Sequence, residues 1–329
     1  MRVLIESECD ADYLAKCHEA FRTGLRCMFD TRMFGKGYPN YDPSLITYQE
    51  IIKHAFPDAQ PHLLLATFSP PTVAKEPFTF TGLSDVQVSK AILLADFWNV
   101  TEGYQKGFLD ILDGYDIGLV LSYFPQPLEI FSETAFATRF IWVPACFDPA
   151  VFNNWHMDKQ FDVGFLAAGT SEHSIYYPER FAIHQKLLQK KNIKYLWAKH
   201  PGWQRHSNDH PLVGRGFSKA INSCRLFVTT RGIYKNPHAK YIEIMASHTV
   251  LLADEPEGAD RLHLQDGVNY VKISEDDVLE KIDSCLAQPS LCKKIAEAGY
   301  RTAMRYHNCY VRAFEFYEAV KPRMDGRSS

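Results

Sequence analysis

Lys240 and Glu243 are the residues whose types and spacing point most directly to chemistry. They fall in a predicted helix over residues 237–247 that follows a predicted strand. Asn236 can cap this helix, and Pro237 suits its first position. Free N–H groups and the helix dipole favour an anion at such a start. Lys240 could therefore neutralise a diphosphate, and Glu243 could accept hydrogen bonds from ribose hydroxyls. An ordinary Lys–Glu surface pair explains the spacing equally well.

Other candidates for an anion or nucleotide site stand where predicted strands end or helices begin. They are Gly169, Thr170, Arg180, His200 and Phe217. Gly169 and Thr170, together with Ser171, follow a predicted strand and could form a phosphate nest, although the same residues also make an ordinary turn. Arg180 or His200 could contact a phosphate or a base. Phe217 could lie against a nucleobase or simply pack.

A catalytic base is harder to identify than an anion site. Asp96, His18 and Glu102 lie near predicted strand ends or helix starts, and Asp96 is the preferred acceptor-facing base, followed by His18. Asp10 and Asp12 form a D-x-D sequence of the kind that holds a metal in some sugar transferases. They also directly precede a predicted helix, where Asp is an ordinary cap. We therefore expect no metal site.

Basic residues are concentrated in one stretch of the second half. Residues 1–150 contain 19 acids and 11 Lys or Arg, whereas residues 151–329 contain 20 acids and 25 Lys or Arg. Between residues 180 and 240, 13 Lys or Arg and five His accompany one acid, Asp209. A solvated face, a nucleic-acid patch or the wall of an anion site could explain this block. Because no nucleic-acid motif is visible, we favour a small phosphorylated ligand and expect no nucleic-acid partner.

The elements that must position these residues alternate between strands and helices. Strands are predicted at 2–6, 25–29, 62–68, 91–95, 117–121, 140–143, 161–167, 194–198, 226–230, 249–253 and 269–273. Helices are predicted at 10–23, 45–55, 101–112, 178–190, 218–223 and 237–247, with a mostly helical tail over 275–320. The irregular segment 147–160 indicates a linker. The alternation predicts α/β domains with doubly wound parallel sheets, which bind ligands at the carboxyl ends of their strands.

Length and composition limit the remaining possibilities. A chain of 329 residues with 46% hydrophobic and 23% charged residues is typical of a soluble protein of about two domains. No apolar run approaches the ~18–20 residues of a membrane span, and the acidic start does not resemble a signal peptide. The eight cysteines form no C-x-x-C pair, so we expect reduced thiols and a cytoplasmic protein. The first strand is not followed by G-x-G-x-x-G, which argues against a nicotinamide cofactor.

Several blocks of the second half resemble those of a known family. KYIEIMASHTVLLAD, from Lys240 to Asp254, resembles the K-x-x-E-x-M-A-S-x-x-L-L block of GT-B glycosyltransferases of the CgeB/YkvP spore-protein-like group. DGVNYVKISEDDVLEKI resembles the strand and helix that follow, and IAEAGYRTAMRYHNCYVRAFEF resembles the closing helices. FDVGFLAAGT, YPERF and GFSKAIN are similar to the opening and middle of the same domain. The resemblance covers about residues 160–320, and the first 150 residues match only in pattern.

This resemblance implies a GT-B fold with two Rossmann-like domains. Residues 1–150 would form the acceptor-side domain, residues 151–308 would bind the nucleotide sugar, and residues 309–329 would form a helix that crosses back to the first domain. The implied activity is a metal-independent hexosyl transfer from a UDP- or GDP-type nucleotide sugar to an acceptor that the resemblance does not name. No further cofactor is implied.

The resemblance also implies roles for particular residues. Glu243 falls on the ribose-binding Glu, and Lys240 and Arg231 fall near the diphosphate contacts. Lys235 stands where many retaining GT-B enzymes carry the first Glu of an E-x7-E motif. Because of this departure, the resemblance sets neither the stereochemistry nor the donor sugar. A nucleotide-sugar epimerase or hydrolase, or a nucleotide-sugar-binding scaffold without catalysis, remains an alternative.

Overall fold

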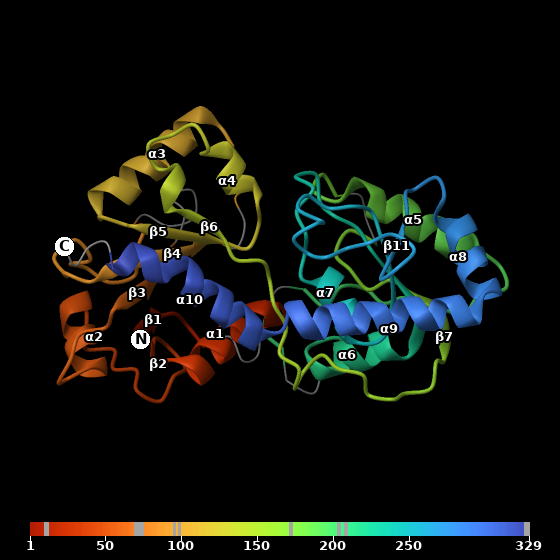
Figure 1. Ribbon diagram of the computed structural model, residues 1–329, viewed down its shortest axis with the longest axis horizontal. Helices are drawn as coiled ribbons and strands as arrows, with labels where there is room; N and C mark the ends of the chain where they lie inside the picture. The colour runs from red at the N-terminus through yellow and green to blue at the C-terminus, as the bar shows by residue number, and fades with distance from the viewer. Residues whose placement is uncertain are drawn as a thin grey trace. The chain divides into compact units, whose positions relative to one another are not determined.

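The computed structural model describes residues 1–9, 13–68, 76–94, 97, 100–170, 174–202, 205–206 and 210–325 (Figure 1). The chain divides into two compact units. The first unit consists of Met1–Asp10, Arg22–Pro144 and Ala313–Ser329, and the second of Ala11–Phe21 and Ala145–Arg312. The candidates Asp10, Asp12, Asp96 and Ser171 lie outside the described residues.

The first unit is built on a parallel sheet. Its strands are β1 (Arg2–Glu6), β2 (Asp30–Phe34), β3 (Leu63–Ala66), β4 (Ser89–Leu94), β5 (Leu119–Ser122) and β6 (Phe140–Trp142). They lie in the order β2-β1-β3-β4-β5-β6, and every neighbouring pair is parallel. The Leu-Leu-Leu-Ala sequence of β3 is buried throughout, as expected for a parallel strand covered on both faces.

Helices cover this sheet. They are α1 (Lys16–Met28) from Arg22 onward, α2 (Tyr48–Ala55), α3 (Glu102–Gly114), α4 (Gln126–Ile130), the 3-10 turn η1 (Ala137–Arg139) and α10 (Cys309–Asp325) from Ala313 onward. A capping box fixes the start of α2, in which the Glu50 N–H donates to Thr47 Oγ1 over 3.2 Å and the Thr47 N–H donates to Glu50 Oε2 over 3.1 Å. Ile51 of α2 and Phe108 of α3 share one core with β1, β3 and β4.

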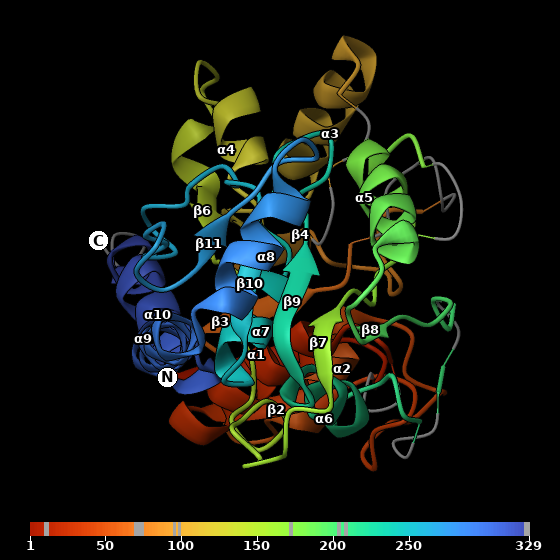
Figure 2. The same ribbon diagram turned by 90° about the vertical axis from the view of Figure 1, so that its right-hand side faces the viewer.

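The second unit contains a second parallel sheet (Figure 2). Its strands are β7 (Phe161–Gly164), β8 (Tyr195–Leu196), β9 (Cys224–Thr229), β10 (Val250–Ala253) and β11 (Val271–Lys272), in the order β11-β10-β9-β7-β8. From β7 the chain goes first to β8 on one side and then to β9 on the other. The direction of strand order therefore reverses at β7, and ligands bind parallel sheets at the carboxyl ends of strands beside such a reversal.

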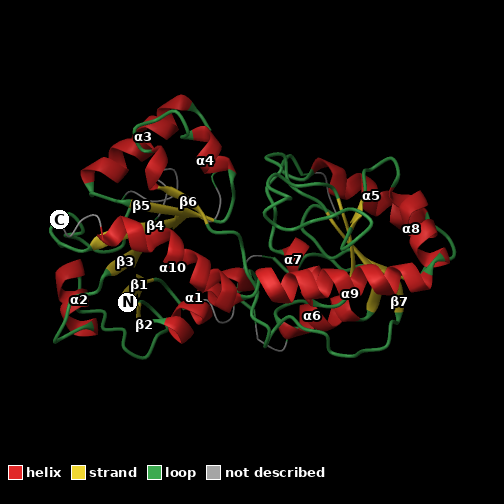
Figure 3. Cartoon of the chain, in the orientation of Figure 1, coloured by secondary structure: helices red, strands yellow, loops and turns green. Residues whose placement is uncertain are grey.

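The helices of the second unit are α5 (Pro178–Gln189), α6 (Arg215–Asn222), α7 (Lys240–Ala246), α8 (Val278–Ala287) and α9 (Pro289–Tyr306) (Figure 3). α7 packs against α6, α9, β9 and β10, and α5 packs against α8. Gly299 of α9 allows close packing on α7, because a Cβ at this position would lie 2.8 Å from Asn269 O and 3.3 Å from Met245 Cγ.

These two parallel sheets confirm the predicted α/β class. One predicted strand is a helix in the structure. The predicted strand at 25–29 is wrong, because α1 continues through Gly24 to Met28. Cys17, Phe21 and Leu25 are all buried at four-residue spacing, so the apolar stripe of the helix runs past the glycine. Among the described residues, no helix is both long and apolar enough to cross a membrane.

Candidate functional site

A cavity of about 140 Å³ opens in the second unit where β7 and β8 end. One water needs roughly 10–15 Å³ by the same measure, so the cavity has room for a ligand. Its walls come from the segments after β7 and β8, from α6 and α7, and from the beginning of α1. Five residues predicted for donor binding line it together: Arg180, His200, Phe217, Lys240 and Glu243.

Glu243 is a buried acid that lacks a hydrogen-bond donor. Its side chain is 6% exposed, and no described residue donates a hydrogen bond to its carboxylate. Burial raises the pKa of Glu243 to about 7, against the opposing effect of the Lys240 charge. Burying a carboxylate without hydrogen bonds costs folding free energy. An acid in this condition on a cavity wall is typical of a binding or catalytic site.

Lys240 stands three residues before Glu243, as the first residue of α7. Its Nζ lies 5.6 Å from the centroid of the Phe217 ring, which is a cation–π distance. No described carboxylate lies within ion-pair distance of this ammonium group. Burial lowers the pKa of Lys240, and the nearby Glu243 opposes that change. The charge of Lys240 is therefore available to a ligand in the cavity.

Arg180, at the start of α5, is held rigidly. It is 3% exposed, its Nη2 donates to Thr230 O over 2.8 Å, and its Nε donates to Thr230 Oγ1 over 3.2 Å. Its Nη1 donates to Ala168 O over 3.0 Å, and the guanidinium carbon lies 3.6 Å from the centroid of the Tyr177 ring. These neutral partners orient the guanidinium without neutralising it. Among the described residues, Arg180 forms no ion pair with a carboxylate.

Two histidines add polar groups to the cavity without adding positive charge at neutral pH. Burial, together with the charges of Lys240 and Arg180, lowers the pKa of His200 to about 4. The same causes hold the pKa of His238 well below its usual range. The positive charge on the described cavity wall therefore comes from Arg180, Lys199 and Lys240.

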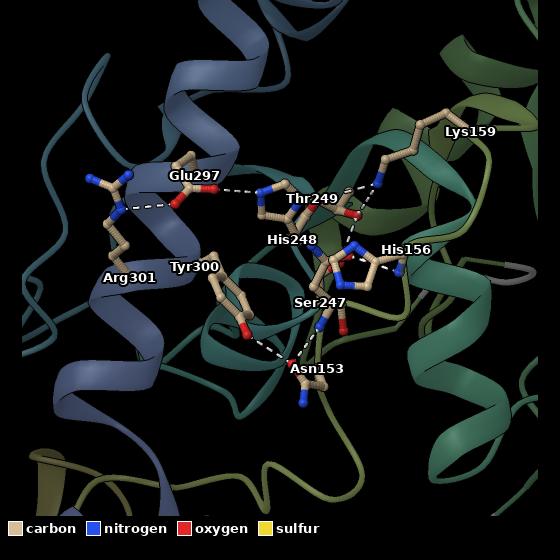
Figure 4. A network of polar contacts seen from close by, with 10 residues as sticks. Asn153, His156, Lys159, Ser247, His248, Thr249, Glu297, Tyr300 and Arg301 are labelled. Atoms are coloured by element: carbon tan, nitrogen blue, oxygen red, sulfur yellow. Dashed lines mark hydrogen bonds and ion pairs between the residues drawn. The ribbon is translucent and has the colours of Figure 1, made fainter.

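The far end of α7 is fixed by a polar network (Figure 4). The Lys159 ammonium donates to His248 O over 3.2 Å and to Thr249 Oγ1 over 3.1 Å. It also donates to Asn222 O, at the end of α6, over 2.8 Å. A cation at two helix C-termini is favourable for both helix dipoles. His248 Nε2 lies 2.9 Å from Glu297 Oε2 of α9, so α7 is tied at this end to both neighbouring helices.

The start of α7 differs from the prediction. The helix begins at Lys240 with Ala239 as its cap, and no side chain caps it, so Asn236 and Pro237 precede the helix. Lys235 adopts a left-handed φ of 55°, which turns the chain before the helix can begin. The site therefore depends on the side chains of Lys240 and Glu243 more than on a long helix dipole.

The predicted phosphate nest at Gly169 and Thr170 does not reach the cavity wall. Thr170 is 1% exposed, and its hydroxyl donates to Ala167 O over 2.9 Å while accepting from Trp197 Nε1 over 3.2 Å. Gly169 has a φ of 77°, and a Cβ there would lie 3.3 Å from Tyr177 Cβ. Both residues lie in the turn that follows β7.

Arg231 and His18 also lie outside the cavity lining. Arg231 borders a second, more open cavity, where its Nε lies 3.1 Å from Asp254 Oδ2 and its Nη1 donates to Glu255 O over 2.7 Å. Its charge is therefore already matched by a carboxylate. His18 lies on α1 directly after Cys17, which does line the first cavity. Glu102 is the first residue of α3, in the first unit.

Sequence reasoning missed several residues of the cavity wall. Lys199 adjoins His200 and belongs to the same basic block, so charge could have identified it. His238 and Tyr177 lie close to predicted site residues in the sequence. Cys17 gave no signal, because its position on the wall depends on α1 packing against residues more than 100 positions away.

Comparison with known proteins gives a similarity for the region that carries this cavity. A family model described as "Glycosyl transferase-like" matches residues 176–318, a range that includes Arg180, His200, Phe217, Lys240 and Glu243. This part of the chain is therefore similar to the glycosyl transferase-like family. No curated protein matches the sequence.

Solved structures show the same fold over the whole chain. HepE of Anabaena, in complex with UDP and glucose, has a TM-score of 0.63 at 13% identity and covers 98% of this chain and 100% of its own. A glycosyltransferase of Rickettsia africae has a TM-score of 0.59 at 10% identity, covering 97% and 98%. Sucrose-phosphate synthase of Thermosynechococcus elongatus has a TM-score of 0.57 at 11% identity, covering 99% and 100%. The two parallel sheets are thus those of the GT-B fold.

Proposed function

We propose that the protein is a glycosyltransferase that takes a hexose from a nucleotide sugar, and that the cavity at Glu243 binds the nucleoside diphosphate. The observation that carries this proposal is the Glu243 carboxylate, which is buried on the cavity wall and lacks a described donor. Two adjacent ribose hydroxyls would supply the missing donors. Arg180, Lys199 and Lys240 would face the diphosphate. The UDP bound to HepE, on the same fold, supports a uridine donor ahead of a guanosine one.

In this proposal the basic side chains drive the departure of the diphosphate. When the bond from the anomeric carbon to the phosphate oxygen breaks, negative charge grows on that oxygen. Arg180 is already oriented by Thr230 and Ala168, so it would stabilise this charge without having to reorganise. Three cations make a metal-independent transfer reasonable, and we propose the reaction in that form.

The acceptor must lose a proton as it attacks. We propose His18 and Asp96 for this role: His18 follows Cys17 of the cavity wall, and Asp96 lies outside the described residues. A glycan, a small molecule or a protein could serve as the acceptor. The sequence blocks from Lys240 onward support membership of the CgeB/YkvP group. The eight cysteines, all in the described part of the chain and none in a disulfide, support a cytoplasmic location.

Ligand-induced stabilisation tests the binding site. The melting temperature would be measured with UDP, GDP, ADP, CDP and TDP, and we expect UDP to give the largest increase. Lys240→Ala and Glu243→Ala should remove this increase. Lys235→Ala is the matched control, because Lys235 is exposed in the same segment and lines the other cavity. The absence of an increase with every nucleotide would refute the proposal.

A reaction assay separates transfer from its alternatives. The protein would be incubated with UDP-glucose, with and without a panel of glycan, small-molecule and protein acceptors. Transfer predicts a glucosylated product only with an acceptor. An isomerised or free sugar without an acceptor would indicate an epimerase or a hydrolase, and UDP binding without any turnover would indicate a non-catalytic scaffold.

A further inference from the structure

Two cysteines meet where α8 turns into α9, away from the donor cavity. Cys285 lies in the last turn of α8, and Cys292 lies at the end of the first turn of α9. The Cys292 thiol donates a hydrogen bond to the Cys285 carbonyl oxygen over 3.0 Å. This contact places the Cys292 sulfur against the Cys285 residue, and neither cysteine is in a disulfide.

The two thiols differ in exposure and in reactivity. Cys285 is 7% exposed and packs with Ile282 and Ile295 in the core, whereas Cys292 is partly exposed. The hydrogen bond with Cys285 and the positive charge of Arg225 lower the pKa of Cys292. The same contact and burial raise the pKa of Cys285. Because the thiolate is the nucleophile, Cys292 is the thiol that attacks first.

We propose that Cys292 and Cys285 form a thiol–disulfide exchange site that reacts with low-molecular-weight disulfides. The Cys292 thiolate attacks one sulfur of the small disulfide, forms a mixed disulfide and expels one thiolate. Cys285 then loses its proton to the expelled thiolate and attacks Cys292 Sγ, which expels the second thiolate. The two protein thiols become one disulfide, and the small disulfide is reduced to two thiols.

Geometry favours closure of the protein disulfide over retention of the mixed one. The Cys292 sulfur lies 3.0 Å from the carbonyl oxygen of Cys285, so the second step is intramolecular and joins two neighbouring residues. Its product would link the end of α8 to the start of α9. An excess of a reducing thiol would reverse both steps, which suits a site in a reducing compartment. The reaction needs no ligand in the donor cavity, so its test is independent of the proposed function.

Mass spectrometry of the full chain treated with glutathione disulfide tests this site. Lys281 and Lys293 bracket a tryptic peptide, residues 282–293, that contains both cysteines and no other basic residue before its end. After an acid quench and alkylation, we expect this peptide to lack two hydrogens, to carry no glutathione and to resist alkylation. Cys27 is the internal control: it is an exposed cysteine of the first unit and should keep its glutathione.

Two variants test the order of the steps. In Cys285→Ser the peptide should retain one glutathione on Cys292, because the resolving thiol is missing. In Cys292→Ser the peptide should react at least tenfold more slowly than Cys27, because Cys285 is buried. A wild-type peptide that stays reduced, or that keeps its glutathione while Cys27 reacts, would overturn the proposal. Equal reaction of Cys285 in Cys292→Ser would overturn the assignment of the nucleophile.

Discussion

Glu6 and Glu243 are buried acids in the two units, and the difference between them separates a structural acid from a binding one. Glu6 is 5% exposed at the end of β1, where the strand order of the first sheet also reverses. Its Oε2 accepts hydrogen bonds from the Thr67 N–H over 2.6 Å and from the Tyr48 hydroxyl over 3.2 Å. Glu243 is 6% exposed beside the reversal of the second sheet, and no described group donates to it.

Burial raises the pKa of both acids, so neither burial nor a shifted pKa distinguishes them. The two acids differ in their hydrogen-bond partners. Glu6 accepts hydrogen bonds from Tyr48 of α2 and from Thr67 after β3. It therefore links β1 to both elements and stabilises the fold. Glu243 leaves its hydrogen-bonding capacity unused, which the fold does not require and a ligand with hydroxyl groups can use.

Removing the carboxylate of Glu6 should have the largest effect on stability. Glu6→Ala leaves the Thr67 N–H and the Tyr48 hydroxyl buried without an acceptor. Each such loss costs about 1–3 kcal/mol, so we expect the free energy of unfolding to fall by about 4 kcal/mol. Urea unfolding measures this change. Stability within 1 kcal/mol of the wild type would show that Glu6 is not structural.

Removing the charge of Glu243 should instead raise the free energy of unfolding. Because the folded-state pKa is raised from 4.5 to about 7, ionisation of Glu243 lowers stability as pH rises through this range. Glu243→Gln does not titrate, so its advantage over the wild type should grow between pH 4.5 and 7 and reach about 3 kcal/mol at pH 8. Unfolding would be followed from pH 5 to pH 8. Glu280→Gln, at an exposed acid of α8, is the control.

The next largest effect should be the loss of UDP affinity when a cation of the cavity wall is removed. Lys240→Ala removes a charge that faces the cavity, and we expect UDP to bind about 10- to 100-fold more weakly, which corresponds to a charge-assisted hydrogen bond of about 1.5–3 kcal/mol. Titration calorimetry measures the affinity. Equal losses in Lys240→Ala and in the control Lys235→Ala would mean that only the general positive charge matters.

The smallest effect expected is a pH dependence of binding. The ionised form of Glu243 is the stronger acceptor for ribose hydroxyls, so wild-type affinity for UDP should fall as pH drops below about 7. We expect a fall of about tenfold between pH 8 and pH 6 beyond that seen in Glu243→Gln. The phosphate of UDP titrates equally in both proteins, so it cancels in the comparison. Parallel pH profiles would contradict a role for this carboxylate.

The sequence was sufficient to predict the fold class, and several of its site candidates line one cavity. Parallel strands covered on both faces appear as short apolar runs, and the strands of both sheets except β2 were predicted from such runs. Arg180, Lys240 and Glu243 were predicted because they lie in the first turns of predicted helices that follow predicted strands. Their presence on one cavity wall follows from the parallel topology.

The differences between prediction and structure have local physical causes that the sequence does not display. Thr170 and Arg231 were suitable by type, but Trp197 and Asp254, which are distant in the chain, already hold their polar groups. The start of α7 depends on the left-handed backbone of Lys235, a conformation that is uncommon for a lysine. Partners and backbone conformations of this kind arise only once the chain has folded.

The ribose contact of Glu243 is the most direct test of this account. Calorimetry at pH 8 would compare UDP with its 2′,3′-dideoxy analogue in the wild type and in Glu243→Ala. We predict that the wild type binds the analogue about 10- to 100-fold more weakly than UDP, and that Glu243→Ala binds both ligands equally. The same loss in both proteins, or full UDP affinity in Glu243→Ala, would contradict the account.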